Sequence, residues 1–277
     1  MKLPDSSAKP LLMGVLNVTP DSFSDGGQHF DPAVAVARAH EMVELGADLI
    51  DVGGESTRPG AGRVPPEEQL ERVIPVIRQL QQELPAEVLI SIDTASSLVA
   101  GAALEQGAAI VNDISAGRDD PGMFSLVAEA GVPYIIMHMQ GVPRTMQDNP
   151  RYTDVVEEIK SFLQERAAGA RDAGVKKENL VIDPGIGFGK SKYDNLDIIM
   201  NLDRFKATGY KVMLGASRKR FMGSICDITE YSELVGATCA TTAIGVFAGV
   251  SILRVHDIKE NRQALDVAWA LAGRQGN

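Results

Sequence analysis

The stretch "ELGADLIDVGGES", residues 44–56, joins a helical segment to a short apolar run that ends in polar residues. Gly46 lies where a helix commonly ends in a left-handed residue, a conformation that glycine adopts without steric penalty. The apolar run after it is rich in leucine, isoleucine and valine, which is typical of a strand buried on both faces. The stretch therefore predicts a helix that leads directly into a buried strand.

The same join recurs along the chain. It is found again in "EQGAAIVNDIS" (105–115), "EAGVPYIIMHMQ" (129–140), "DAGVKKENLVIDPG" (172–185), "ATGYKVMLGASRK" (207–219) and "FAGVSILRVHD" (247–257). Two further apolar runs, "LLMGVLN" (11–17) and "EVLISIDT" (87–94), have the same shape without the glycine. Eight strands separated by helix-length amphipathic segments predict an α/β fold, a (β/α)8 TIM barrel formed by residues 1–277 as a single domain. A doubly wound open sheet is the alternative.

The amino-acid composition limits the kinds of binding partner and the cellular setting that we expect. The formal net charge is -10, from 27 basic and 37 acidic residues, which argues against nucleic acid or an anionic membrane as the main partner. Cys226 and Cys239 give neither a disulfide framework nor a metal spacing, so we expect a reduced, cytoplasmic setting. The N-terminus lacks the apolar stretch of a signal peptide. The long apolar segment 234–253 is interrupted by glycine and threonine and indicates a helix followed by a strand, with no membrane span.

Polar or charged residues end all eight predicted strands. In a parallel barrel these ends meet at one opening, where such enzymes place their active sites. Solvent exposure alone would explain glycine, asparagine and serine there, but the density of Asp, Lys, Arg and His favours a functional site. The end residues are Asn17, residues 55–58, Asp93, Asn112, Asp113, His138, Met139, Gln140, Asp183, residues 217–219, Arg254 and His256.

Two carboxylates at these ends indicate the kind of ligand. Asp93 and Asp183 each follow an apolar strand, so each carboxylate needs a donor. Lys219 or Arg254 could supply it in an ion pair, or an aminopyrimidine-type heterocycle could supply its ring N–H and exocyclic amine. Asn112 would complement a mixed donor and acceptor edge, and Lys219 would donate to a ring carbonyl.

Two cations at the last strand indicate an anion. Arg254 and His256 are two residues apart on one strand, so their side chains point to the same face. Arginine with a second N–H donor suits a phosphate or diphosphate. Asn17, on the adjacent first strand, offers an oxygen ligand for Mg²⁺. A buried, satisfied core histidine is the alternative for His256.

The glycine-rich segment "DPGIGFGKS" (183–191) matches neither a P-loop nor a dinucleotide fingerprint, because its glycines have the wrong spacing. We interpret it as a loop in which Phe188 covers an aromatic substrate; a tight turn that needs glycine dihedrals is the alternative, and the two are compatible. "GASRKRF" (215–221) predicts the start of a helix with Ser217 near its N-cap, a place for a carboxylate. Lys219 could instead be a Schiff-base lysine, which needs a sequestered position at a strand end. Lys219 lies two residues past the strand end with Arg218 and Arg220 alongside, which favours an ammonium donor.

Together these motifs resemble the dihydropteroate synthases, the folate-pathway enzymes that sulfonamides inhibit. The resemblance runs from about residue 12 to residue 270. The matching segments, in the family's order, are "MGVLNVTPDSFSDGG", "DVGGESTRPGA", "SIDT", "NDI", "MHMQGVPRTMQ", "DPGIGFGK", "SRK" and "RVHD". The resemblance implies a (β/α)8 barrel, usually dimeric, that joins 6-hydroxymethyl-7,8-dihydropterin diphosphate to p-aminobenzoate and releases diphosphate and 7,8-dihydropteroate, with Mg²⁺.

The resemblance also implies roles for individual residues. Pterin contacts fall on Asp93, Asn112, Asp183 and Lys219, with Met139 against the ring, and Gly215 belongs to the substrate-binding set. Diphosphate contacts fall on Asn17 (with Mg²⁺), Thr57, Arg254 and His256. The p-aminobenzoate pocket would involve Phe23, Thr57, Arg58, Pro59, Phe188, Ser217 and Lys219. Residues 18–27 would form a flap in which Asp25 or Asp21 offsets a pterin cation and Phe23 shields it from water.

Two alternatives and two departures from the family pattern stay open at this point. A pterin-binding methyltransferase would share the carboxylate contacts but has no use for a diphosphate site, and an inactive pterin-binding paralogue would bind without turnover. The leader before the first strand is short, which leaves the closure of the barrel bottom open, and Arg220 stands where the family often has serine.

The helix at 237–249 is apolar around most of its circumference, which predicts burial in a homodimer.

Overall fold

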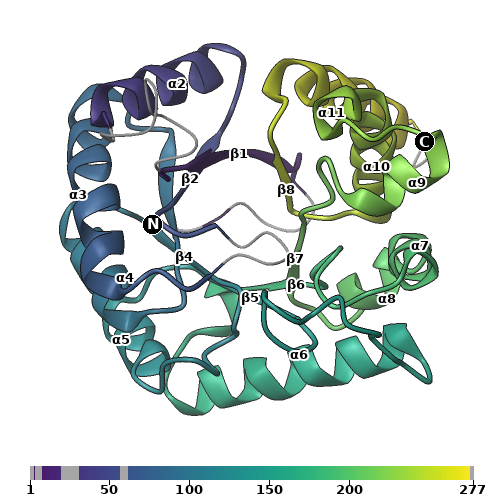
Figure 1. The fold of residues 1–277 in the computed structure, drawn as a ribbon, viewed down its shortest axis with the longest axis horizontal. Helices are drawn as coiled ribbons and strands as arrows, with labels where there is room; N and C mark the ends of the chain where they lie inside the picture. Colours follow the sequence, from purple (N-terminus) through teal and green to yellow (C-terminus); the bar gives the residue numbers. More distant parts are fainter. Residues whose placement is uncertain (1–2, 4–7, 20–30, 57–61, 275–277) are drawn as a thin grey trace.

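The computed structural model describes residues 3, 8–19, 31–56 and 62–274, and in it the strands form a closed parallel barrel (Figure 1). The strands are β1 (Leu11–Asn17), β2 (Leu49–Gly53), β3 (Leu89–Asp93), β4 (Ile110–Asp113), β5 (Tyr134–Met137), β6 (Leu180–Asp183), β7 (Lys211–Leu214) and β8 (Ile252–Val255). Each strand pairs with the next, and β1 also pairs with β8, with Met13 opposite Arg254. The predicted barrel is confirmed, and the open sheet is wrong.

Helices surround the barrel on its outside (Figure 1). They are α2 (Pro32–Glu44), α3 (Pro66–Glu83), α4 (Ser97–Glu105), α5 (Met123–Ala130), α6 (Val155–Asp172), α7 (Lys192–Met200), α8 (Leu202–Lys206), α9 (Arg220–Cys226), α10 (Val235–Ala248) and α11 (Ile258–Ala272), with short 3-10 turns η1 (Lys177–Asn179) and η2 (Tyr231–Glu233). The six glycines that precede predicted strands all have a positive φ, for example +102° at Gly46 and +66° at Gly131. The predicted helix-to-strand joins are therefore confirmed at the backbone level.

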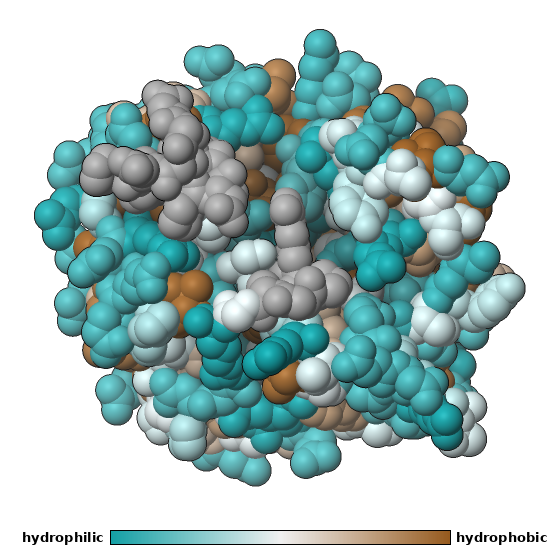
Figure 2. All heavy atoms as spheres, viewed as in Figure 1, coloured by the Kyte–Doolittle hydropathy of each residue, from teal (hydrophilic) through white to brown (hydrophobic). Residues whose placement is uncertain are grey.

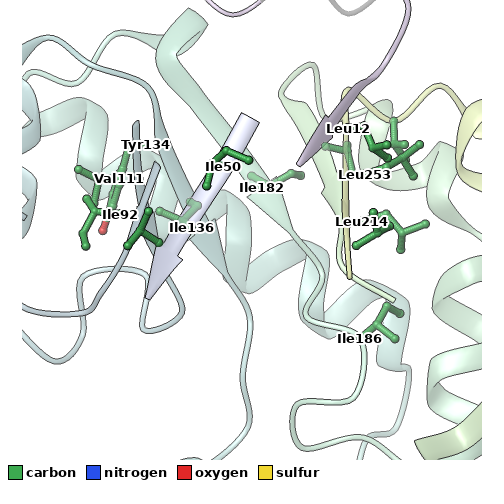
Figure 3. Packing of buried hydrophobic residues seen from close by; sticks show 14 of the residues in the cluster. Leu12, Ile50, Ile92, Val111, Tyr134, Ile136, Ile182, Ile186, Leu214 and Leu253 are labelled. Carbon is green, nitrogen blue, oxygen red and sulfur yellow. The ribbon is translucent and has the colours of Figure 1, made fainter. Parts of the chain in front are cut away.

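The strands are apolar on both faces, which explains why their sequences do not alternate. The outer face of each strand packs against the helices and forms the main hydrophobic core with them. Figure 3 shows members of this core on the strands, among them Leu12, Ile50 and Leu253. The other face points into the barrel, where an apolar layer is formed by Met13, Leu49, Ile110, Ile135, Val181, Met213 and Ile252. Because successive strand residues point to opposite faces, each strand contributes to both cores.

Leu3, in the leader, belongs to this inner layer and is 6% exposed. The part of the short leader that the structure describes thus places a side chain against the apolar end of the barrel. Figure 2 shows a mainly hydrophilic molecular face, with apolar side chains in small patches. Within the described ranges, no helix is both long and apolar enough to cross a membrane.

Candidate active site

The residues that point into the barrel become polar one step beyond the apolar layer. Two residues after Leu49 comes Asp51, two after Val181 comes Asp183, and two after Ile252 comes Arg254, so these side chains share the inner face. Strand register then brings Asp93 beside Asn112, and Asn17 beside Gly53. A polar layer therefore lies on an apolar floor at the C-terminal ends of the strands.

Arg254 crosses this polar layer to two carboxylates. Its Nε donates to Asp51 Oδ2 at 2.7 Å and its Nη2 to Asp93 Oδ2 at 2.8 Å. Asn112 Nδ2 donates to the same Asp51 oxygen at 3.0 Å. Lys219 and Arg254 are the two candidate donors to Asp93 from the sequence, and in the structure the donor is Arg254. An ion pair and a ligand contact are compatible here, because a guanidinium has five N–H donors.

Asp51 is a site residue that the sequence analysis missed. Its side chain is fully buried, and its Oδ1 accepts no hydrogen bond from the residues that the structure describes. A signal was present, because a carboxylate inside an apolar strand needs partners in the barrel interior. Asp51 was not predicted because it lies inside β2 and the site residues predicted on the strands were all taken from the strand ends.

Burial sets the electrostatics of the polar layer. It raises the pKa of Asp93 to about 7, an effect that Arg254 opposes and Asp51 reinforces. Burial also raises the pKa of Asp183. The ammonium of Lys219 is affected in the opposite sense: burial, with repulsion from Arg254, lowers its pKa to about 8. Groups with pKa values displaced toward neutrality are typical of functional sites.

The glycine-rich loop turns back over this layer with three left-handed glycines. Gly185, Gly187 and Gly189 have φ values of +70°, +82° and +63°. A Cβ on Gly185 would lie 2.0 Å from the His138 carbonyl oxygen, so only glycine fits there. The expected need for glycine dihedrals is confirmed.

This loop carries Phe188 to the wall of the site. Phe188 is 8% exposed and packs with Met137, Met139 and Met146. The Lys219 ammonium lies 4.1 Å from the centroid of its ring, within the range of a cation–π contact. Asp183 Oδ1 accepts from Gly185 N at 2.7 Å, so the loop and the carboxylate are held together.

The predicted helix start in "GASRKRF" is confirmed, with Ser217 two residues before the N-cap, but Ser217 does not cap the helix. Helix α9 begins at Arg220, its N-cap is Lys219, and no side chain caps it. Ser217 Oγ lies 3.2 Å from the backbone N of His256 and 3.0 Å from His256 Nδ1. The reason is that the chain turns sharply at Arg218, which has φ +56° and pairs with Asp257, before the helix starts. Ser217 therefore positions His256 and does not cap a helix.

A cavity of about 700 Å³ opens above the polar layer. Seven residues predicted for substrate or metal contacts line it: Asn17, Phe188, Gly215, Ser217, Lys219, Arg254 and His256. Asp93, Asn112, Met139 and Asp183 are buried around its base, between 2% and 7% exposed. The remaining predicted residues, Asp21, Phe23, Asp25, Thr57, Arg58 and Pro59, lie outside the described residues, as does most of the predicted flap 18–27.

The comparisons with known proteins agree with this geometry. Residues 13–256 match the family described as "Pterin binding enzyme". The chain is 43% identical to dihydropteroate synthase of Escherichia coli K12 over 97% of this chain and 94% of that protein. It is 44% identical to the mitochondrial folate synthesis bifunctional protein of Arabidopsis thaliana over 99% of this chain, but spans only 52% of that longer protein.

Solved structures agree as well. A structure of Xanthomonas albilineans dihydropteroate synthase with 4-aminobenzoic acid has a TM-score of 0.89 and 44% identity, covering 95% of this chain and 93% of that one. A second structure of the same enzyme, in complex with 7,8-dihydropteroate, has a TM-score of 0.86 and 39% identity over 98% of both chains.

Proposed function

The chain belongs to the pterin-binding enzyme family as a dihydropteroate synthase, and from this membership we propose how its barrel mouth holds the two substrates. Such a transferase joins a dihydropterin diphosphate to p-aminobenzoate and releases diphosphate. The observation that carries the proposal is the contact of Arg254 with Asp93, at 2.8 Å. It brings a cation suited to the diphosphate next to a carboxylate suited to the pterin.

The pterin lies on the buried polar layer. Asp183 and Asp93 accept its donor groups, Asn112 meets its mixed edge, and Met139 packs on its ring. Asp93, Asn112 and Asp183 belong to β3, β4 and β6, where the barrel ladder fixes their positions before any ligand binds. Met139 lies two residues beyond the end of β5. Preorganisation of this kind lowers the entropic cost of binding.

The diphosphate lies against Arg254 and His256, next to the pterin carboxylate Asp93. Arg254 keeps N–H donors beyond those given to Asp51 and Asp93, and the Ser217 hydroxyl fixes His256. Both cations stabilise negative charge that develops on the leaving group. Thr57 stays a predicted contact.

The residues present fit a bound Mg²⁺. Within the described ranges, no three His, Cys, Asp or Glu side chains are grouped so that they could hold a metal. Mg²⁺ commonly takes few protein ligands and fills its shell with water and substrate phosphates, so Asn17 at the mouth would suffice. When bound, Mg²⁺ supplies charge neutralisation of the diphosphate.

The p-aminobenzoate lies in the open cavity, against Phe188, Ser217 and Lys219. The Phe188 ring offers an apolar wall and the Lys219 ammonium a counter-charge for the carboxylate. Phe23, Arg58 and Pro59 stay predicted members of this subsite. Arg220 also lines the cavity, so it is available to the same carboxylate.

The reaction that this arrangement favours begins with departure of the diphosphate. The dihydropterin stabilises the exocyclic cation that remains, and the amine then attacks the cationic carbon. The new C–N bond replaces the C–O bond, and the amine proton is lost to solvent. No covalent enzyme intermediate is needed, so Lys219 acts as a donor and not as a Schiff base. Asp25, Asp21 and Phe23 stay predicted as the groups that offset and shield the cation.

A diphosphate-release assay with each substrate omitted in turn tests this function. We expect diphosphate and dihydropteroate in equal amounts when both substrates and Mg²⁺ are present. An inactive pterin-binding paralogue would bind the pterin without releasing diphosphate. A pterin-binding methyltransferase would not consume p-aminobenzoate.

We further propose that the enzyme is a homodimer in the reduced cytoplasm. Helix α10 leaves Ile244 and Phe247 nearly half exposed, and α11, which packs on α10, leaves Val267 and Leu271 more than half exposed. Two adjacent helices with exposed apolar side chains suit a self-complementary interface. Cys226 and Cys239 are free thiols, as a reducing setting requires.

A further inference from the structure

Lys190 is buried between the two loops that wall the site. It follows the glycine-rich loop and is 3% exposed. Its Nζ lies 3.0 Å from His138 Nδ1, 3.3 Å from the His138 carbonyl oxygen and 3.0 Å from the Phe188 carbonyl oxygen. Three uncharged acceptors meet Lys190 Nζ, which has three donors when it is protonated. Burial lowers the pKa of Lys190 to about 7.

The imidazole of His138 is arranged to accept this hydrogen bond. Burial, reinforced by Lys190, lowers its pKa to about 2, so the ring is neutral. In the tautomer with its proton on Nε2, Nδ1 carries a lone pair that accepts from Lys190 Nζ. The edge-on ring of Phe162, 4.9 Å away between centroids, holds its orientation. His138 directly precedes Met139, so Lys190 Nζ bridges the segment that carries Met139 and the segment that carries Phe188.

Side chains hold the loop that carries Phe188 through three of its carbonyl groups, in addition to the Gly187 N–H, which donates to Asn195 Oδ1 at 2.7 Å. Gln147 Nε2 donates to the Gly187 oxygen at 2.6 Å, Lys190 to the Phe188 oxygen, and Tyr152 OH to the Gly189 oxygen at 2.7 Å. Three successive carbonyl groups thus accept hydrogen bonds from side chains. A loop outside the barrel ladder has no strand partner to fix its backbone, so these donors take that role.

We propose that Lys190 is a positioning residue for p-aminobenzoate, because it fixes the backbone that presents Phe188 to the cavity and to the Lys219 ammonium. The inference rests on the proposed division of the site. The aromatic ring lies 4.1 Å from Lys219 Nζ, and a Cβ on Gly187 would lie 2.9 Å from Lys219 Cδ. A shift of the loop would therefore move both the apolar wall and the ammonium.

The strand backbone that carries the pterin carboxylates does not depend on Lys190 in this way, although the charge of Lys190 acts on Asp183. Asp93 and Asp183 are the last residues of β3 and β6, and the barrel ladder fixes them. Loss of Lys190 should therefore weaken the amine subsite much more than the pterin subsite. A general loosening of the protein would weaken both.

The test compares Lys190→Met, which removes all donors, with Lys190→Gln, which keeps two. Exposed Lys176→Met is the control for the substitution itself. The measurements are the KM for p-aminobenzoate by diphosphate release, the Kd for the pterin diphosphate by calorimetry, and thermal unfolding of each variant.

For Lys190→Met we expect the KM for p-aminobenzoate to rise about tenfold or more, because small misplacements of site residues can cost up to ~100-fold. The Kd for the pterin diphosphate should stay within about twofold, and Lys190→Gln should recover part of the loss. An unchanged KM, or equal losses for both substrates, would overturn the inference. If Lys190→Met does not fold, the same comparison of the KM for p-aminobenzoate with the Kd for the pterin diphosphate is made on Lys190→Gln and Tyr152→Phe. We expect smaller increases in KM for these two variants. An inactive wild-type protein would instead refute the proposed function, so the two failures are distinguishable.

Discussion

Arg254 Nη2 lies 2.8 Å from Asp93 Oδ2, so the cation suited to the leaving group and a carboxylate suited to the heterocycle are bonded to each other. The contact offsets part of the cost of burying the two charges, although burial still raises the pKa of Asp93 to about 7. It also couples the two subsites, since a change in the charge of Asp93 is felt at Arg254.

The pH dependence of activity should follow from Asp93 and Lys219. With a pKa of about 7, Asp93 loses its proton as pH rises and then accepts the pterin donors. Lys219, with a pKa of about 8, loses its positive charge just above that. We expect a narrow, bell-shaped profile of kcat/KM with limbs near these values. Lys219→Arg should remove the alkaline limb, because arginine stays protonated; a limb that persists in this variant would exclude Lys219 as its source.

Asp93 should make the free energy of unfolding fall as pH rises, whereas its loss of a proton raises activity. The folded pKa lies above the unfolded value of ~3.9, so the folded protein binds this proton more tightly. The stabilisation is complete below pH ~4 and is lost as pH rises through about 7. Denaturation by urea between pH 4 and 8 measures it, and Asp93→Asn should flatten that dependence. A wild-type curve no steeper than the variant's would contradict the assignment.

Asp51 should matter for activity although we place no substrate on it. Asp51→Asn removes the charge that accepts from Arg254 Nε and from Asn112. We expect kcat/KM to fall about 10- to 100-fold, because a hydrogen bond to a charged group contributes roughly 1.5–3 kcal/mol. Asp266→Asn, in an exposed ion pair with Lys9, should change little. Equal activities of the two variants would exclude a positioning role for Asp51.

Two glycines with nearly the same φ form a matched test of backbone packing. Gly185 and Gly131 have φ values of +70° and +66°, but a Cβ on Gly185 would strike the His138 oxygen and one on Gly131 would meet nothing within 4 Å. We expect Gly131→Ala to lower the free energy of unfolding by about 1–2 kcal/mol. Gly185→Ala should cost several kcal/mol more, because backbone atoms must move. Urea denaturation decides, and similar losses would contradict the role given to the clash.

The dimer face can be tested at one exposed side chain. Phe247→Glu on α10 should produce a monomer, because a charge would be buried at the interface. Leu98→Glu on α4, where Leu98 is 55% exposed, is the control and should stay dimeric. Light scattering at micromolar concentration measures both. A wild-type monomer, or a dimer in the Phe247 variant, would refute this face.

The architecture could be predicted from the sequence because it repeats. All eight strands are short apolar runs, and six of them follow a glycine with a positive φ, such as Gly46 or Gly131. Eight such units close only in a few ways. The strand ends could be predicted for the same reason. Asp93, Asn112, Asp183 and Arg254 lie at one opening because the ladder puts them there.

Contacts that depend on packing could not be predicted in the same way. Ser217 looked like a helix cap, but the start of α9 is set by the turn at Arg218 and by its pairing with Asp257. Asp51 and Lys190 were missed because one lies inside a strand and the other after a glycine-rich motif. Their roles come from neighbours distant in sequence, Arg254 and His138, which periodicity does not reveal.

The central claim is that carboxylates at the barrel mouth bind the heterocycle and that cationic groups beside them bind the departing anion. Calorimetry with two fragments tests this claim most directly. The probes are 6-hydroxymethylpterin and inorganic diphosphate with Mg²⁺, each titrated into wild type, Asp183→Asn and His256→Ala. We predict a crossed result: Asp183→Asn loses the pterin and keeps diphosphate, and His256→Ala keeps the pterin and loses diphosphate. Loss of the same fragment by both variants would contradict the account.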